Sequence, residues 1–239
     1  MKIALMRHGE TEFNARRIFL SRTDAELNET GMRQAKSAAQ RLSLGSWSAI
    51  YASPLARSQQ VADVLSGELR LPVRLFDGLR ERELGELEGL GIEDYAQSHP
   101  AEYARLINDP DYAPHRGETQ HAVVDRVTEC LKMMVRQSTS SAPGAALVVT
   151  HGAVLAILAR HAGLPGDRLR AAVRNCHLLC LDAEFDTGQS LSLRLRHWDV
   201  APDEAGAWAS SASLETTVPS PSAEATWPRT NAQPRNSSC

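Results

Sequence analysis

The sequence predicts an α/β protein: a three-layer α/β/α sandwich with a largely parallel central sheet and a small helical cap. Short apolar runs of strand length alternate with longer segments of helical periodicity along most of the chain. Two of these runs, at 3–6 and 145–149, are continuously apolar, which is typical of strands buried on both faces. Each run leads within two residues into His-Gly, so reactive side chains arrive at the strand ends, where open α/β sheets bind ligands.

The individual elements can be placed in chain order. Asn28 predicts the N-cap of the first long helix, and Ser53 followed by Pro54 predicts the start of the second. A turn signal at 186–188 predicts that the last two strands form an antiparallel hairpin at one edge of the sheet. We expect strands at 2–7, 48–52, 72–76, 145–150, 177–182 and 191–197, and helices at 29–43, 55–69, 92–98, 101–107, 119–137 and 153–162.

The chain divides into one domain and a tail. Residues 1–200 predict a single domain, with the cap at about 91–118. After Trp198 the composition shifts to Ala, Ser, Thr, Pro and Asn with few large aliphatic residues. Such a segment buries too little apolar surface to order itself, so we expect 201–239 to be a disordered tail.

Composition narrows the class of function. The 239 residues carry a net charge of −3, with 42% hydrophobic and 23% charged residues. Without a basic cluster or a basic amphipathic helix, the sequence predicts neither a nucleic-acid nor a membrane surface. The N-terminal apolar run is too short for a signal peptide or a membrane span, which makes the cytoplasm the expected location. Any attraction for an anionic substrate must therefore come from a local pocket.

The four cysteines show neither a Cys-x-x-Cys pattern nor a zinc-ligand spacing. We expect them to be reduced thiols, and we expect no metal and no cofactor. They are Cys130, Cys176, Cys180 and Cys239.

The two strand ends carry the strongest chemical signal. The first reads Arg7-His8-Gly9-Glu10-Thr11, and the second reads His151-Gly152 before an apolar helix. A helix N-terminus presents unpaired N–H groups and a positive dipole end, which suit an anion. One such histidine is more often a structural hydrogen bonder, but two placed alike favour a shared site.

Two further segments supply a cation and a carboxylate. Arg57 lies about one turn into the second long helix, from which its guanidinium can reach back to the strand end; an ordinary solvated arginine is the alternative. The acidic stretch 79–89 is for the most part expected to be solvated surface. One carboxylate from it, Glu81, would complete a reaction centre.

With these segments in hand, the sequence resembles the histidine phosphatase superfamily, in its phosphoglycerate-mutase-like branch. The resemblance extends from Met1 to about Trp198. The motifs that carry it are Arg7-His8-Gly9-Glu10-Thr11 with Asn14, Asp24 to Leu27 with Gly31, Ser53-Pro54-Leu55-Ala56-Arg57, Glu81 with Gly85 and Gly89, Gly117-Glu118-Thr119, and Val149-Thr150-His151-Gly152.

The resemblance implies a role for each motif residue. His8 would be the nucleophile, held at its second ring nitrogen by a carbonyl of the Gly9 loop, and Glu81 the proton donor. The phosphate clamp would be formed by Arg7, Arg57 and His151, whose positive charge and hydrogen-bond donors suit phosphate oxygens. Further substrate contacts are expected from Asn14, Ser21 and Gly152.

Some positions depart from the family pattern. Ile18 and Ser21 stand where the family usually has an arginine and a glycine, and Thr119 stands where serine is commoner. These departures concern the pocket wall and the identity of the substrate. Sugar phosphates, phosphoglycerate, phosphoserine and nucleotide-like phosphates, including α-ribazole phosphate, remain open.

The cap segment favours one activity over another. The segment 91–116 is short, and its only basic residues are Arg105 and Arg116, so a second anionic group on the substrate would find few partners. We therefore expect hydrolysis of a small phosphate monoester, with mutase-type phosphoryl transfer, a protein phosphohistidine phosphatase and a non-catalytic binding module as alternatives. Tyr95, Tyr103 and Tyr112 are expected to pack within the cap more than to line the substrate, and His115 is a candidate substrate contact.

Overall fold

A six-stranded sheet forms the centre of the protein in the computed structural model, which describes residues 1–137, 144–166, 173–186 and 190–211. The strand order is β3-β2-β4-β1-β5-β6. The first four strands in this order run parallel, whereas β5 and β6 are antiparallel and form the edge predicted from the sequence. The strands are β1 (Lys2–Arg7), β2 (Trp47–Ala52), β3 (Val73–Leu75), β4 (Ala145–Thr150), β5 (Leu178–Phe185) and β6 (Leu191–Val200).

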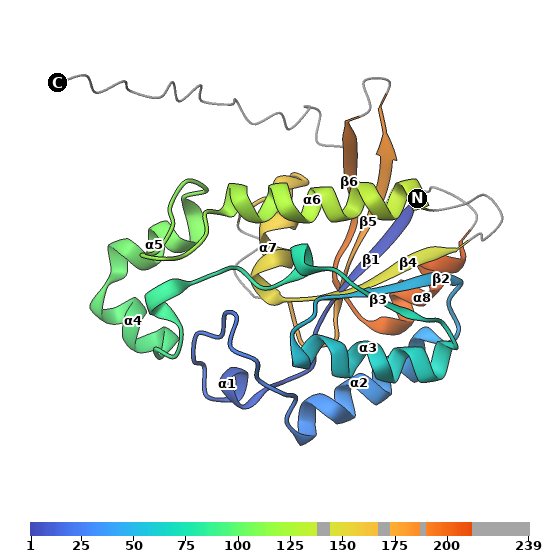
Figure 1. Ribbon diagram of the computed structural model, residues 1–239, viewed down its shortest axis with the longest axis horizontal. Coiled ribbons are helices and arrows are strands. Elements are labelled where there is room, and N and C mark those ends of the chain that lie inside the picture. Colours follow the sequence, from blue (N-terminus) through green and yellow to red (C-terminus); the bar gives the residue numbers. More distant parts are fainter. Residues whose placement is uncertain (138–143, 167–172, 187–189, 212–239) are drawn as a thin grey trace.

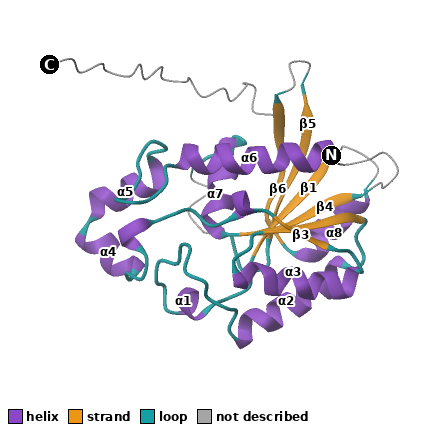
Figure 2. Cartoon of the chain, viewed as in Figure 1, coloured by secondary structure: helices purple, strands orange, loops and turns teal. Residues whose placement is uncertain are grey.

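Helices cover both faces of this sheet, which confirms the three-layer α/β/α fold (Figures 1 and 2). On one face, α6 (Gln120–Gln137) and α7 (Gly152–His161) pack against Ile3 and Leu5 of β1. On the other face, α2 (Glu29–Leu42) and α3 (Ala56–Leu69) pack against Ala4 and Met6. Alternate residues of one strand thus enter two separate cores, which is why the strand reads as continuously apolar.

The register of three neighbouring strands brings distant segments together. Arg7 pairs with Thr150 where β1 and β4 end side by side, and Ala52 of β2 pairs with Val149 of β4. The residues that follow these ends, Ser53, His8 and His151, therefore enter the same edge of the sheet although they lie far apart in the sequence.

The cap consists of α4 (Ile92–Ser98) and α5 (Pro100–Asn108), which lie together beyond this edge of the sheet (Figure 1). Leu106 of α5 forms a small apolar cluster with Phe19, Leu84 and Leu87. The three cap tyrosines pack against this cluster, as expected from the sequence: Tyr95, Tyr103 and Tyr112.

The start of α3 differs from the prediction. The helix begins at Ala56 with Leu55 as its N-cap, and no side chain caps it. Ser53, the predicted cap, is fully buried, and its hydroxyl contacts the ring of His151. Sequence pattern alone could not show this, because the hydroxyl is taken by a residue 98 positions away.

The first part of the predicted tail is also ordered. Residues Pro202–Ser210 form α8, in which Ala205 and Ala209 are buried and Ala205 belongs to the core on the α2 side of the sheet. The ammonium of Lys2 donates to the carbonyl of Trp208 and also lies over its ring. The prediction of disorder is therefore wrong for this helix, which is held by tertiary contacts that its composition does not reveal. Residues 212–239 lie outside the described part of the chain.

Several smaller features complete the fold. Asn28 caps α2 through a hydrogen bond from the Gly31 N–H, as predicted. Cys130, Cys176 and Cys180 are free and buried, while Cys239 and the centre of the predicted turn at 186–188 lie outside the described residues. None of the helices in the described part of the chain is long and apolar enough to cross a membrane.

Candidate active site

His8 follows the last residue of β1 and is 3% exposed. Its Nδ1 lies 2.7 Å from the carbonyl oxygen of Gly9. Because a carbonyl only accepts, Nδ1 carries the proton of the neutral ring, and Nε2 keeps its lone pair. The turn is tight: a Cβ on Gly9 would lie 2.6 Å from the carbonyl oxygen of Gly31, so only glycine fits. A carbonyl of the Gly9 loop thus lies against the second ring nitrogen of His8, as expected from the sequence.

His151 sits at the N-cap of α7, with its ring centroid 5.2 Å from that of His8. Its Nε2 lies 2.8 Å from the hydroxyl oxygen of Ser53, which also accepts a hydrogen bond from the N–H of Leu55. The hydroxyl can thus donate its proton to Nε2, which leaves the proton of neutral His151 on Nδ1. Nδ1 is buried and has no partner among the described residues, which suits a donor to an anionic ligand.

Two arginines approach the same place. Arg57 is completely buried and donates to the carbonyl oxygens of Ser21 and Thr23, at 2.6 and 2.9 Å. Arg7 donates from one terminal nitrogen to the carbonyl of Val173 at 2.7 Å. In both residues Nε is buried and has no hydrogen-bond partner in the described part of the chain. Guanidinium donors left over in this way match the oxygens of a phosphate group.

Glu81 supplies the acidic group. It is 7% exposed, and its carboxylate accepts from the backbone N–H of Arg82 at 2.8 Å and of Ala153 at 3.3 Å. The second donor belongs to the first turn of α7, directly after His151 and Gly152. The acid loop and the β4–α7 junction are therefore joined through this carboxylate.

The pKa values of the histidines and arginines depend on one another's charges and on that of Glu81. Burial, and then the charges of Arg57 and Arg7, hold the pKa of His8 well below its usual range. Burial, followed by Arg57 and His8, does the same for His151. Burial lowers the pKa of Arg57 to about 10 and also lowers that of Arg7; in both, the Glu81 carboxylate is the largest opposing charge. At neutral pH the site therefore has two uncharged imidazoles between two cationic guanidiniums.

Three further predicted contacts fare differently. Asn14 lies in α1 (Glu12–Ala15), where its side-chain oxygen accepts a hydrogen bond from the Thr11 N–H at 3.3 Å. This contact holds the Asn14 amide beside the loop that follows β1. Gly152 begins α7, and a Cβ there would approach Nε of Arg7 to 3.3 Å, so the glycine lets this guanidinium lie close to the helix end.

The structure does not support the predicted substrate contact through Ser21. Its backbone N–H donates to the carboxylate of Glu88 at 3.0 Å, and its hydroxyl donates to the carbonyl of Arg82. Both donors are buried and engaged, because the turn at 85–88 brings a carboxylate to this loop. His115 is 73% exposed and pairs with Glu86, so no described contact joins it to the site.

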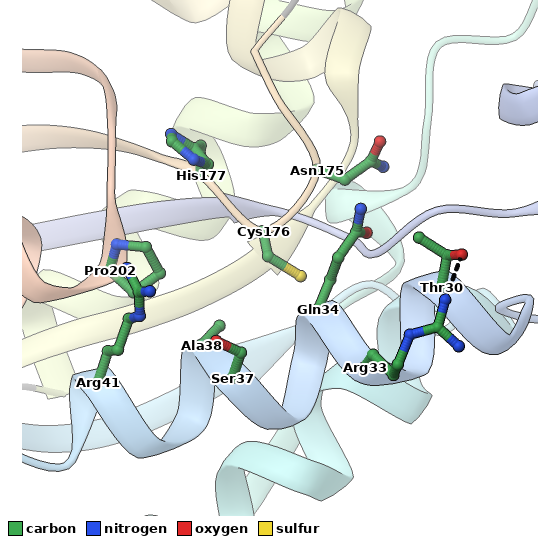
Figure 3. Close-up of a pocket in the computed structure, with 10 residues that line it drawn as sticks. All are labelled: Thr30, Arg33, Gln34, Ser37, Ala38, Arg41, Asn175, Cys176, His177 and Pro202. Atoms are coloured by element: carbon green, nitrogen blue, oxygen red, sulfur yellow. Dashed lines mark hydrogen bonds between the residues drawn. The ribbon is translucent and has the colours of Figure 1, made fainter.

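Two supporting residues were not predicted from the sequence. Asn175 donates from its side-chain amide to the carbonyl of His8, and Gln34 accepts from the N–H of Glu10. Both line a pocket beside α2, which Figure 3 shows. None of the predicted site residues lines this pocket. No local pattern marks these amides, because each acts on a backbone group far away in the sequence.

This arrangement has the groups that phosphate-ester chemistry needs. One imidazole presents a lone pair, a second presents a donor, two guanidiniums offer unpaired N–H groups, and a carboxylate lies beside them. Such a site can neutralise a phosphate group, attack its phosphorus atom and exchange a proton with the ester oxygen. No group of three or more metal-binding side chains occurs in the described residues.

The chain belongs to the histidine phosphatase superfamily (branch 1), whose family model matches residues 3–195. It is similar to a metal-independent phosphoserine phosphatase of Arabidopsis thaliana, with 32% identity over 74% of this chain and 76% of that protein. It is also similar to a probable phosphoglycerate mutase, GpmB, of Cronobacter sakazakii, with 31% identity over 76% of this chain and 85% of that protein.

A solved structure gives the same result. A mycobacterial glucosyl-3-phosphoglycerate phosphatase, determined with VO3, superimposes with a TM-score of 0.74 and 28% identity, covering 82% of this chain and 98% of that chain. Family membership, together with relatives named as phosphatases, makes this protein a phosphoric monoester hydrolase.

Proposed function

We propose that the protein hydrolyses a small phosphate monoester, without a metal, through a covalent phosphohistidine on His8. The observation that carries this proposal is the state of the His8 ring. Its Nδ1 is fixed on the Gly9 carbonyl, and burial beside two arginines keeps the ring uncharged, so Nε2 is a ready nucleophile.

In the first step, Nε2 of His8 bonds to phosphorus and the phosphorus–oxygen bond of the ester breaks. The electron pair of that bond leaves with the alcohol oxygen, which takes the proton of the Glu81 carboxylic acid. The unpaired Nε donors of Arg7 and Arg57 and the Nδ1 donor of His151 support the negative oxygens of the transferring group. Because two guanidiniums neutralise the phosphate, the reaction does not require a metal ion for this purpose.

In the second step, the Glu81 carboxylate takes a proton from water. The water oxygen bonds to phosphorus while the nitrogen–phosphorus bond breaks, and His8 returns to its neutral form. Inorganic phosphate leaves, and Glu81 again holds the proton that the next cycle needs. The two backbone N–H groups on Glu81 support this role, because they orient the carboxyl in both steps.

The charges around the cap favour a substrate whose alcohol part is neutral. Three of the arginines that the loops and the cap bring to this region already pair with carboxylates, so a second anionic group would compete with those carboxylates for them. These pairs are Arg17 with Glu93, Arg22 with Glu83 and Glu118, and Arg105 with Asp109. This is the reason to prefer hydrolysis of a monophosphate over mutase-type transfer between two positions of a phosphorylated acid.

The cap also argues for a small substrate. Helix α5 contributes Leu106 to an apolar cluster with Phe19, Leu84 and Leu87, and α4 packs against this cluster through Ile92 and Tyr95, which gives this side of the site an ordered wall. A folded protein carrying phosphohistidine would need a more open approach than such a wall allows. A protein phosphohistidine phosphatase is therefore the less favoured activity.

The test is a panel of phosphate monoesters assayed with the full chain in EDTA, beside His8→Asn. Asparagine keeps a donor for the Gly9 carbonyl but has no nucleophilic nitrogen, so we expect kcat to fall by roughly 10⁴-fold or more. Rapid acid-free quenching with labelled substrate should give a phosphoenzyme in the wild type and none in the variant. His197→Asn, on β6 at the far edge of the sheet, is the matched control.

Three results would contradict the proposal. Hydrolysis by His8→Asn at the wild-type rate would show that His8 is not the nucleophile. Isomerisation of phosphoglycerate without phosphate release would favour the mutase. Complete inactivity of the wild type towards every monoester would favour a binding module.

A further inference from the structure

Arg82 is a buried arginine that the reaction outlined above does not use. It is 3% exposed, and its guanidinium donates to three carbonyl oxygens from separate segments of the chain. Nε donates to Glu118 at 2.9 Å, and the two terminal nitrogens donate to Leu106 at 2.9 Å and Tyr112 at 2.8 Å. Leu106 belongs to α5, whereas Tyr112 and Glu118 lie in the loop that follows it. This one side chain therefore joins the cap helix to two points of that loop.

The backbone of the same residue holds the proton donor. The Arg82 N–H donates to Oε1 of Glu81 at 2.8 Å, the shorter of the two hydrogen bonds to that carboxylate. Burial lowers the pKa of the Arg82 guanidinium, and the Glu81 charge is the largest effect that opposes this. The residue therefore contacts the acid through its main chain and the base of the cap through its side chain.

We propose that Arg82 is a positioning residue, which fixes the Glu81 carboxyl relative to the base of the cap. It thereby places this carboxyl beside the leaving group of the substrate. The inference rests on the proposed function, because it assigns a role in the step in which Glu81 protonates the ester oxygen. A carboxyl that is displaced by even 1 Å transfers its proton poorly. Substrates whose alcohols are poor leaving groups should suffer most.

A second arginine anchors the same part of the cap without contacting Glu81. Arg160, at the end of α7, donates to the carbonyl of Ile107 and to the side-chain oxygen of Gln120. The amide nitrogen of Gln120 donates in turn to the carbonyls of Leu106 and Ile107. Arg160 is thus a matched control, since loss of its contacts loosens the end of α5 but leaves the Arg82–Glu81 contact in place.

The experiment compares two aryl phosphates with the full chain. p-Nitrophenyl phosphate has a leaving group that needs little protonation, whereas phenyl phosphate has nearly the same shape and a much poorer leaving group. The ratio of their kcat/KM values reports proton donation in the first chemical step. We expect Arg82→Lys to lower kcat/KM for phenyl phosphate at least about tenfold more than for p-nitrophenyl phosphate. Glu81→Gln should show the same selective loss, and Arg160→Lys should lower both values alike.

The outcomes separate this inference from the proposed function. An unchanged ratio in Arg82→Lys, or an equal change in Arg160→Lys, would overturn the positioning role while hydrolysis by the wild type upholds the function. A wild type that hydrolyses neither ester would overturn the function itself. Arg82→Gln, which keeps a single donating group, is the second variant. If far-ultraviolet circular dichroism shows both variants unfolded, Arg82 is a structural residue and the inference is wrong.

Discussion

Two pairs of arginines show how differently this fold uses the same side chain. At the strand ends, Arg7 makes one hydrogen bond to a carbonyl and Arg57 makes two, and both keep a buried Nε without a partner in the described residues. Beneath the cap, Arg82 uses all three of its nitrogens, and Arg126 makes five hydrogen bonds to Gly78, Arg80, Glu81 and Glu118.

The difference lies in the surroundings. The cap and the loop that returns from it deliver carbonyl oxygens to Arg82, and the loop that precedes the cap delivers them to Arg126, so the donors of both guanidiniums are occupied. Beside Arg7 and Arg57, the N-terminus of α7 presents N–H groups, which cannot accept a hydrogen bond, and the Nε donors of both arginines stay available. An arginine whose donors are all hydrogen-bonded within the fold stabilises it. An arginine that keeps an unpaired donor can bind an anion.

The largest effect should come from the strand-end pair. Replacing Arg7 by Lys keeps the charge but removes the planar fork, so we expect kcat/KM to fall by about 10²- to 10³-fold. Because the side chain makes only one hydrogen bond within the fold, the free energy of unfolding should change by no more than about 1 kcal/mol. Steady-state kinetics and urea unfolding measure the two quantities. Near-normal kinetics with a large loss of stability would reverse the comparison.

The opposite outcome is expected beneath the cap. Arg126→Gln leaves several carbonyls and the Glu118 carboxylate without their partner, so the free energy of unfolding should fall by about 2–4 kcal/mol. Its kcat/KM should fall less than about tenfold, since no donor of Arg126 is left for a ligand. Urea unfolding followed by circular dichroism checks the first value. A loss of activity as large as that of Arg7→Lys, with normal stability, would contradict this assignment.

The smallest effect concerns pH. Folding lowers the pKa of His8 and of His151 below the unfolded value near ~6.5, so the unfolded chain takes up protons first as the pH falls. The stability of the wild type should therefore decline from about pH 7 to pH 5, by at most about 1.4 kcal/mol per pH unit for each histidine.

His8→Asn removes one of these two groups and should flatten the decline, which urea unfolding at a series of pH values measures. His197→Asn serves again as the control for the loss of a histidine elsewhere. Its pKa is lowered by burial to a smaller degree, so its removal should flatten the curve less. Equal slopes for the wild type and His8→Asn would show that His8 is not held neutral by the fold.

Most of the architecture could be read from local pattern. The parallel strands, the helices on both faces and the antiparallel edge follow from apolar runs and their spacing, and the cap helices from their periodicity. The errors concern tertiary contacts. Composition predicted disorder for Pro202–Ser210, but Ala205 and Ala209 find a buried face and Trp208 a partner in Lys2. Ser53 has the pattern of a helix cap, yet its hydroxyl is engaged by His151.

For the site, the sequence by itself singled out the residues to which we assign the chemistry in our proposal: His8, Arg7, Arg57, Glu81 and His151 all stand in motifs beside predicted strand ends or loops. Only the tertiary structure decided what each of their atoms is free to do. The register of β1 and β4 brings the two histidines together, burial keeps them uncharged, and distant carbonyls select which guanidinium donors remain unpaired. The physical reason is that a motif fixes the identity of a side chain, whereas the availability of its hydrogen bonds depends on groups brought from far along the chain.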